Sequence, residues 1–199
     1  MRTSTSSHRT VPVRERTRAD VPACVQVLRA VHENDAYPLV WPANPARWLS
    51  PQRQHRAWVS CSADGEVTGH IALSDLNGHP MADPCMSVTG RPVEQLVAIS
   101  RLFVSPAWRH RGLATRLLAV ASRDAHSYDR WPVLDVSTEN TGALALYRRL
   151  GWNEIARITI GSAPRIPVIV LLGTAPRSRQ TEQTQVNFVA SDRETQEEL

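Results

Sequence analysis

The residues best suited to chemistry occur where an apolar run meets a helical pattern, in the stretch LFVSPAWRHRGLATRLL at 102–118. The N–H groups in the first turn of a helix are unpaired and carry partial positive charge, so they can bind an anion such as phosphate. Gly112 has no Cβ to hold an anion away from the main chain. Three arginines add full positive charges: Arg109, Arg111 and Arg116. By spacing alone, a phosphate-binding turn and a plain strand-to-helix turn fit equally well.

The same stretch lacks two common nucleotide-binding motifs. It has no GxxxxGK[ST] sequence, and it does not contain the three glycines of a dinucleotide fingerprint. A P-loop or a Rossmann-type site is therefore not expected.

The elements that must position this turn can be predicted from periodicity and turn residues. Strands are expected at 11–17, 56–63, 66–76, 96–104, 131–138, 152–160 and 165–172. Helices are expected from Asp20, as the cap, to Val31, over 112–128, and over 140–150 with Gly151 just past the end. Asp64-Gly65 predicts a tight hairpin turn with positive φ angles. Loops are expected at 35–54, which holds four prolines and short helical turns, and at 77–92, which is irregular.

Length and composition predict one domain with polar tails. The chain has 199 residues, of which 42% are hydrophobic, enough for a core of ordinary size. We expect a flexible tail at 1–10 and one domain at 11–172. The remaining segment, 173–199, is polar, and we expect it to be disordered or to form a short terminal helix.

The charge balance restricts the function only weakly. The 23 basic residues are all arginine and stand against 19 acidic residues, for a net charge of +4. Such an excess suits nucleic acid, an acidic cofactor or neither, and no helix-turn-helix, zinc or aromatic-stacking signature favours nucleic acid. The chain has no run of ~18 apolar residues and no pattern resembling a signal peptide. We therefore expect a cytoplasmic protein without a membrane partner.

Candidate metal ligands and reactive thiols are few. Three cysteines are present: Cys24, Cys61 and Cys85. They form no CxxC pair, so neither a disulfide framework nor a zinc site is expected, and a reducing compartment fits. His32, Glu33 and Asp35 are close in sequence, but no second cluster has ligand spacing. A solvated helix end is the simpler interpretation, and no metal is expected.

Two motifs resemble the signatures of the GNAT N-acetyltransferase superfamily. Arg109-His110-Arg111-Gly112-Leu113-Ala114 is similar to its pyrophosphate-binding motif, R/Q-x-x-G-x-G/A. STENTGALALYRRLGW at 137–152 resembles its second signature, an Asn followed by a helix that ends in Tyr-x-x-Leu-Gly-aromatic. Stretches 13–28 and 65–73 resemble the family's first strand and helix and its third strand, so the resemblance covers 11–172 in the family's order.

This resemblance implies an α/β (α+β) fold with a single mixed, mostly antiparallel twisted sheet. The sheet would contain a central splayed strand pair and be flanked by about four helices. The implied activity is that of an acetyltransferase with acetyl-CoA as the acyl donor and an amine as the acceptor.

The resemblance also assigns cofactor contacts by position. Backbone N–H groups from Arg111 to Thr115 would hold the pyrophosphate, and main-chain groups of the splayed strand would bond the acetyl carbonyl and the pantetheine amides. Asn140 would bond the pantetheine arm and can also cap the helix that follows. The implied coenzyme A contacts are Leu102, Phe103, Val104, Arg109, His110, Arg111, Gly112, Leu113, Ala114, Thr115 and Asn140.

Tyr147 matches the family tyrosine that protonates the leaving thiolate. A phenol is a hydrogen-bond donor at neutral pH and can act as a general acid. From spacing alone, a packed aromatic on the helix face of Ala143 and Leu150 is the simpler interpretation. The resemblance favours catalysis.

The general base is the point at which this sequence departs from the family pattern. Ala98 stands where many members carry a glutamate on the central strand, and an alanine cannot accept a proton. The amine is then deprotonated through water or by another group, and the candidates are Glu94, Asp75 and His70. An ordinary histidine pKa suits this role, but His70 lies in an alternating strand where it can simply face solvent.

By the same resemblance, the acceptor site would be built from 31–54, 77–92 and 158–168. Aromatic residues of the first segment either line a pocket or fill the core; they are Tyr37, Trp41 and Trp48. No acidic cluster favours a polycationic acceptor, so a small amine, an amino acid derivative and a peptide amine all stay open.

Two other functions also stay open, an acyl-CoA-binding regulatory module without turnover and transfer of a different acyl group. By analogy with the family, we also consider a homodimer.

Overall fold

In the computed structural model, which describes residues 11–161 and 164–174, the chain forms one seven-stranded sheet in the order β1-β2-β3-β4-β5-β7-β6. The strands are β1 (Val13–Glu15), β2 (Gln54–Cys61), β3 (Val67–Ser74), β4 (Leu96–Val104), β5 (Trp131–Ser137), β6 (Asn153–Ile160) and β7 (Ile166–Leu172). Neighbouring strands pair antiparallel, except β4 and β5, which are parallel. This mixed, mostly antiparallel sheet confirms the expected fold class. Apart from Gly173 and Thr174, the expected tails lie outside the described residues.

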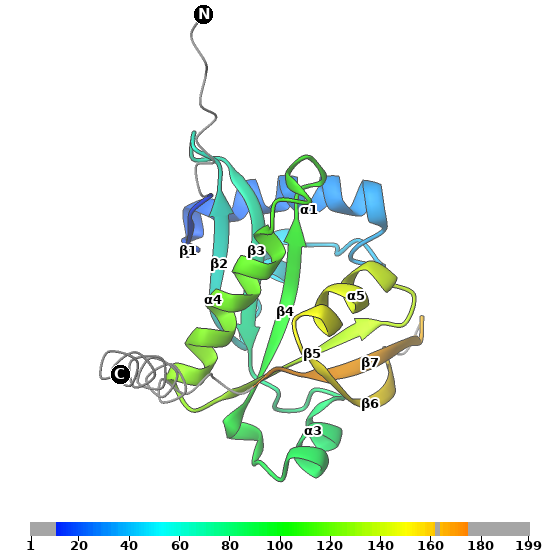
Figure 1. The fold of residues 1–199 in the computed structure, drawn as a ribbon. Coiled ribbons are helices and arrows are strands. Elements are labelled where there is room, and N and C mark those ends of the chain that lie inside the picture. The colour runs from blue at the N-terminus through cyan, green and yellow to red at the C-terminus, as the bar shows by residue number, and fades with distance from the viewer. Residues whose placement is uncertain (1–10, 162–163, 175–199) are drawn as a thin grey trace, which may run out of the picture.

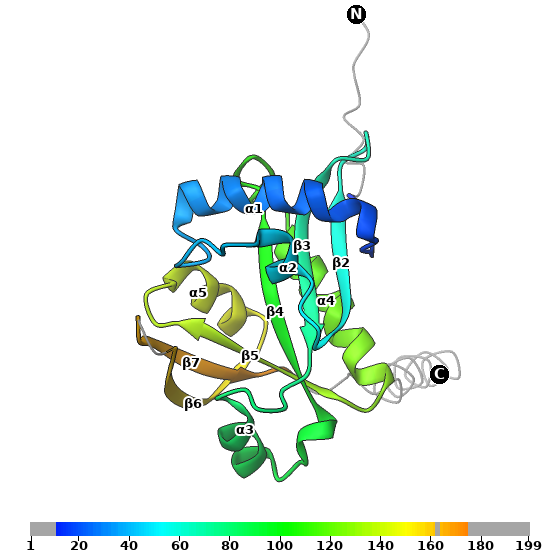
Figure 2. The ribbon, with the colours of Figure 1, turned by 180° about the vertical axis from the view of Figure 1, so that it is seen from behind.

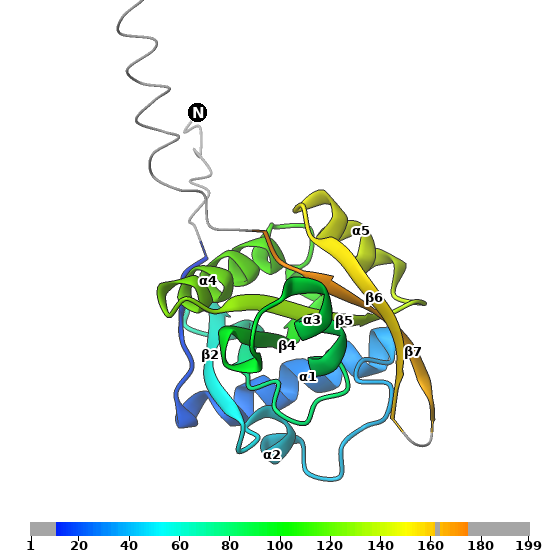
Figure 3. The same cartoon turned by 90° about the horizontal axis from the view of Figure 1, so that it is seen from below.

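Helices cover both faces of the sheet. Those in the described residues are α1 (Val21–Asp35), α2 (Pro45–Leu49), α3 (Ala82–Thr89), α4 (Leu113–Ser127) and α5 (Thr141–Arg149). Figure 1 shows α4 and α5 on one face, Figure 2 shows α1 and α2 on the opposite face, and in Figure 3 the sheet lies between them. The core beneath α4 and α5 includes Leu117 and Leu134, whereas α1 and α2 pack Leu28 and Leu49 around Phe103. None of the described helices has the length and apolarity needed to cross a bilayer.

The central strands β4 and β5 separate after a short stretch of pairing. They pair at Leu96 with Trp131, Val97 with Pro132 and Ala98 with Val133. Beyond Ala98, β4 continues to the end of its range while β5 diverges from it, as Figure 1 shows. The expected splayed pair is therefore present, and it leaves one main-chain edge of β4 open towards β5.

A bulge accompanies this separation. His70 pairs with Phe103 and Ala72 with Ser100, so Arg101 and its neighbour on β4 together oppose a single residue of β3. Arg101 has φ of 53°, a left-handed conformation that is uncommon for a residue with a side chain. A bulge of this kind bends a strand and redirects its side chains.

Helix α3 lies within 77–92, where an irregular loop was expected, so that prediction was wrong. Pro84 falls in the first turn of α3, where a missing N–H costs no helical hydrogen bond. Gly90 closes the helix with φ of 65° and donates its N–H to the carbonyl of Met86. Cys85 of α3 is buried against β4 and β5, and the other two cysteines are also buried free thiols.

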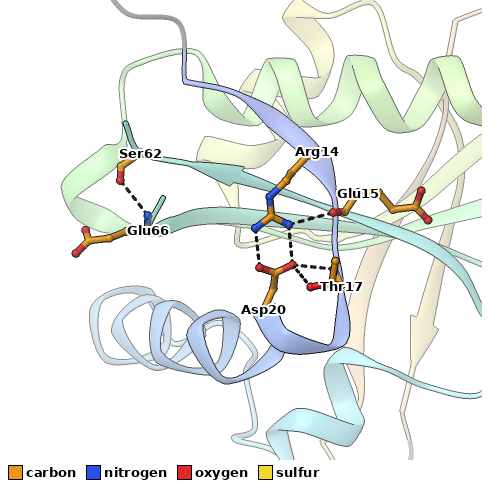
Figure 4. Close-up of polar contacts among 6 residues, drawn as sticks. All are labelled: Arg14, Glu15, Thr17, Asp20, Ser62 and Glu66. Atoms are coloured by element: carbon orange, nitrogen blue, oxygen red, sulfur yellow. Dashed lines mark hydrogen bonds and ion pairs between the residues drawn. The ribbon is translucent and has the colours of Figure 1, made fainter. Parts of the chain in front are cut away.

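The start of α1 is held differently from the prediction. Asp20 occupies the position before the helix, but its side chain does not cap the helix. The carboxylate instead accepts two hydrogen bonds of 2.7 Å from the guanidinium of Arg14 and one of 2.7 Å from the N–H of Thr17, as Figure 4 shows. The guanidinium holds the pKa of Asp20 well below its usual range. This pair ties β1 to the start of α1.

The β2–β3 hairpin turn is wider than the tight turn that Asp64-Gly65 suggested. Gly65 has φ of 85°, whereas Asp64 is not among the described residues with positive φ. The N–H of Gly65 donates to the carbonyl of Ser62 at 3.1 Å, and the N–H of Glu66 donates to the hydroxyl of Ser62 at 3.1 Å (Figure 4). The glycine alone therefore supplies the left-handed residue.

Candidate functional site

The turn between β4 and α4 has the geometry of an anion-binding helix start. The first hydrogen bond of α4 runs from the N–H of Arg116 to the carbonyl of Gly112, at 3.1 Å. The N–H groups of Leu113, Ala114 and Thr115 therefore precede the helical bonds and point out of the helix end. Gly112 has φ of 72°, and no atom lies within 4 Å of the point where a Cβ would stand. Glycine is thus needed here for its conformation, and the space before the helix is open.

The two arginines of this turn differ in their partners: Arg109 is paired with a carboxylate, and Arg111 lies over an aromatic ring. Arg109 forms an ion pair with Asp35 at the end of α1, with Nη1 3.0 Å from one carboxylate oxygen. The guanidinium lowers the pKa of Asp35, so this pair stays charged. The guanidinium of Arg111 lies 4.6 Å from the ring centroid of Trp108 and stays next to the turn. His110, with φ of 59°, is exposed in the loop itself.

Of the other predicted cofactor contacts, Leu102, Phe103 and Val104 lie on β4 beyond its pairing with β5, and Asn140 follows β5. The side chains of Leu102 and Val104 pack towards α4, whereas that of Phe103 packs towards α1 and stacks on His70 with ring centroids 5.1 Å apart. The carbonyl of Phe103 points to Gly69 on β3, so Leu102 and Val104 are the residues whose main-chain groups face the side where β5 has diverged. Asn140 follows β5 and caps α5, accepting the N–H of Ala143 at 3.1 Å through its Oδ1. Its Nδ2 remains a donor.

Tyr147 lies on α5 and is 7% exposed. Its ring packs on Trp152 with centroids 5.8 Å apart, so part of its role is structural. Burial raises the pKa of Tyr147 above its ordinary value, and the charges of Tyr37 and Asp135 act in the same direction. Tyr147 is therefore a protonated phenol at neutral pH, as a proton donor must be.

The structure places the candidate base His70 in the core rather than in solvent. His70 is fully buried, and its Nδ1 lies 2.9 Å from the carbonyl of Arg101 while its Nε2 lies 3.0 Å from Nη1 of Arg16. Burial lowers its pKa to about 3, so the ring is neutral. A neutral ring donates from Nδ1 to the carbonyl and accepts at Nε2 from the guanidinium. Both nitrogens are thus used to hold the β4 bulge.

The other two candidate bases lie at the wrong end of the sheet. Asp75 follows the end of β3 that pairs with the start of β4, and it is bound to His55 and lies 3.8 Å from Arg130. Glu94 belongs to a short 3-10 turn that precedes β4. The gap opens at the opposite end of β4, so neither carboxylate faces it.

Asp135 is a candidate that the sequence analysis did not consider. It lies on β5 just beyond Val133, the last residue of β5 that pairs with β4, and it is half-buried. Burial raises the pKa of Asp135, and the nearby His79 opposes that effect. Burial raises the pKa of Tyr37 and of Tyr147, and the charge of Asp135 adds to that rise in both. A carboxylate inside the apolar strand WPVLDVST was the available signal.

An open pocket of about 410 Å³ lies on the other side of β4 from α4. Its lining residues are Asn44, Arg47, Trp48, Pro51, Gln52 and Arg101. The expected acceptor segment 31–54 thus contributes most of this pocket. Trp48 lines the pocket, while Tyr37 and Trp41 pack against the core under α1, so the aromatic residues serve both purposes that the sequence suggested.

The group around His32 is engaged in other contacts. Its Nδ1 lies 2.8 Å from the carbonyl of Pro38, and Asp35 is bound to Arg109. Within the described residues no three His, Cys, Asp or Glu side chains are arranged to hold a metal ion.

The divergence of β4 and β5 and the open helix start at Gly112 are two features that the resemblance to an acyltransferase family implied. Residues 27–152 match the model of the acetyltransferase (GNAT) family. The chain belongs to this family, and it is therefore an acyltransferase that uses acetyl-CoA as the acyl donor.

Relatives and solved structures agree with this assignment. N-alpha-acetyltransferase RimI of Mycobacterium tuberculosis is 30% identical over 142 residues, which cover 70% of this chain and 76% of that protein. An uncharacterized N-acetyltransferase of Methanocaldococcus jannaschii is 29% identical over 109 residues, which are 54% of this chain but only 43% of the relative.

Among solved structures, NAA60 of Arabidopsis thaliana in complex with acetyl-CoA has a TM-score of 0.63 at 16% identity, covering 82% of this chain and 97% of that one. The ribosomal-protein-S18-alanine N-acetyltransferase of Escherichia coli has a TM-score of 0.59 at 16% identity, covering 85% and 98%. At these identities the two structures share the fold with this chain.

Proposed function

We propose that this enzyme acetylates a primary amine of a small molecule or peptide by direct attack within a ternary complex. The observation that carries the proposal is the loss of β4–β5 pairing after Ala98 and Val133. It leaves an open main-chain edge between the anion-binding turn at Gly112 and the phenol of Tyr147. A thioester bound along that edge would have its phosphates at one end and its reacting carbonyl beside the tyrosine.

In this proposal the cofactor is held mainly by main-chain groups. The N–H groups from Arg111 to Thr115 bind the pyrophosphate, and main-chain groups of Leu102 and Val104 bond the pantetheine amides and the acetyl carbonyl. Asn140 donates to the pantetheine arm from its Nδ2. Arg111 adds charge at the turn, whereas Arg109 shapes it through its pair with Asp35.

The chemistry assigned to the side chains is a single acyl transfer. The amine lone pair attacks the thioester carbonyl carbon, a C–N bond forms, and the C–S bond breaks. Tyr147 gives its phenolic proton to the leaving thiolate, and Asp135 accepts the proton that the amine loses. The raised pKa of Asp135 suits a proton acceptor, and its position at the gap supplies the carboxylate that Ala98 cannot.

Tyr147→Phe tests the acid role directly. With acetyl-CoA and a panel of amines, kcat measured by thiol release should fall about 100-fold, as expected for loss of a general acid, while the Kd of coenzyme A stays within twofold. Tyr128→Phe is the matched control, because Tyr128 is 66% exposed at the end of α4. An unchanged kcat in Tyr147→Phe would remove this residue from the mechanism.

The same assay separates the alternatives. A regulatory module would bind acetyl-CoA tightly and release no thiol with any amine, whereas transfer of another acyl group would appear as a higher kcat/KM with a longer acyl-CoA. Sedimentation of the purified chain tests whether it forms a homodimer. Salt-dependent DNA binding tests our expectation that the enzyme has no nucleic-acid partner.

A further inference from the structure

Arg101 is a half-buried cation without a carboxylate partner among the described residues. Its Nε donates to the carbonyl of Trp48 at 2.5 Å and its Nη1 to the hydroxyl of Ser100 at 3.0 Å, both neutral acceptors. Its Nη2 makes no hydrogen bond with any described residue, and burial lowers its pKa. Buried charges in proteins are normally paired. Arg101 lines an open pocket, so a ligand bound there can supply the counter-charge that the described residues do not.

The surroundings hold this guanidinium in one place. The left-handed main chain of Arg101 is fixed by the hydrogen bond between its carbonyl and His70, which Arg16 holds from the other side. The side chain lies over the ring of Trp48, 4.8 Å from the centroid. A preorganised guanidinium loses little entropy on binding a carboxylate, and its fork geometry matches one.

The pocket around Arg101 is electropositive. A second cation, Arg47, lies exposed on its lining, and the other lining residues are neutral: Asn44, Trp48, Pro51 and Gln52. None of the residues that line it is acidic. The pocket thus repels a second cationic group and attracts an anion.

The pocket adjoins Tyr37 through Trp48. The rings of Trp48 and Tyr37 lie 6.2 Å apart, and the charge of Arg101 acts on the pKa of Tyr37. Tyr37 in turn acts on Tyr147, and Asp135 acts on both tyrosines. An acceptor that reaches from Arg101 to Asp135 would cross the space beside these tyrosines.

We propose that the acceptor is a small amine that carries a carboxylate, such as a free amino acid. Its carboxylate binds Arg101 and Arg47, and its amine faces Asp135. This inference rests on the proposed function and narrows it, because a peptide N-terminus presents an uncharged amide where the carboxylate would be.

The test uses matched probes, the proteinogenic amino acids and the carboxamide of each. Calorimetric titration of the coenzyme A complex gives binding, and thiol release from acetyl-CoA gives turnover. For the best amino acid we expect the acid to bind about 10- to 100-fold more tightly than its amide, as for a charge-assisted hydrogen bond. Arg101→Gln should abolish that preference, and Arg101→Lys should restore part of it.

Two further variants keep the test decisive. Arg47→Gln alters an exposed residue and should weaken the preference without unfolding the protein, so it decides the outcome if Arg101→Gln is unstable. Arg123→Gln removes the same charge from an exposed position on α4, on the opposite face, and should change nothing. The proposal is overturned if amides bind as well as acids, if no probe binds, or if the preference survives in both pocket variants. Absence of thiol release alongside acid-selective binding would instead count against the proposed function.

Discussion

Gly112→Ala tests the anion-binding turn, because its cost can be worked out from the structure. Gly112 has φ of 72°, and no atom lies within 4 Å of the position of a Cβ. An alanine therefore meets no neighbour, and the penalty is the left-handed conformation alone, roughly 1–2 kcal/mol. The loop before α4 is exposed and can relax to escape this strain. Binding of coenzyme A must then restore the strained conformation, so affinity should fall about 5- to 30-fold, since ~1.4 kcal/mol is tenfold.

Gly65→Ala is the matched control, because Gly65 has φ of 85° and an equally open Cβ position in the hairpin turn away from the site. Gly65→Ala should lower the free energy of unfolding in urea by the same roughly 1–2 kcal/mol. Its affinity for coenzyme A, measured by calorimetry, should stay that of the wild type. Gly112→Asn should recover part of the affinity, because asparagine tolerates the left-handed region. If Gly112→Ala lost as much stability as the control and bound coenzyme A as tightly as the wild type, the assignment of this turn to the pyrophosphate would be refuted.

Three other substitutions probe the site and its scaffold. Asp135→Asn should lower kcat/KM about 100-fold near neutral pH, and the loss should shrink as pH rises because more of the amine is already deprotonated; a loss that is equal across the pH profile would contradict a base role. Gly69→Ala should destabilise the fold by about 1–3 kcal/mol in urea unfolding, since its Cβ would stand 2.8 Å from the hydroxyl of Ser60; an unchanged midpoint would show that the neighbours yield. Asp20→Asn should cost about 1–2 kcal/mol at pH 7 through the lost pair with Arg14. Because the pKa of Asp20 is lowered in the folded state, its contribution is present above about pH 4 and is lost below it, so wild type and variant should converge in acid; a gap that is constant between pH 7 and pH 3 would argue against this ion pair.

The fold was largely accessible to prediction because most of its elements have local signals. The strand expected at 96–104 has the same bounds as β4, since its branched apolar run stops at Ser105-Pro106. Helix α3 was not predicted within 77–92, although Pro84 falls in its first turn, where a proline breaks no helical bond. Alternation in the sequence allowed His70 to face solvent, but β3 is buried from Thr68 to Ser74, so both of its faces are covered.

The candidate site was predictable only where it is contiguous in sequence. The turn at Gly112 and the segment from Asn140 to Tyr147 each carry a motif. The convergence of Asp135 and Arg101 depends on how β4 and β5 diverge and on a bulge that no glycine marks, and neither can be inferred from neighbouring residues.

The divergence of β4 and β5 also implies that the stability of this enzyme would depend on the concentration of acyl-CoA. The open edge of β4 is an unfinished part of the sheet, and a ligand that completes it binds the native state and not the unfolded chain. Such binding adds about 2.7 kcal/mol of stability when the free ligand stands at 100 times its Kd. When acyl-CoA is scarce, more of the chain is transiently unfolded and open to proteolysis. A cell that runs short of the donor would then lose the catalyst as well as the reaction.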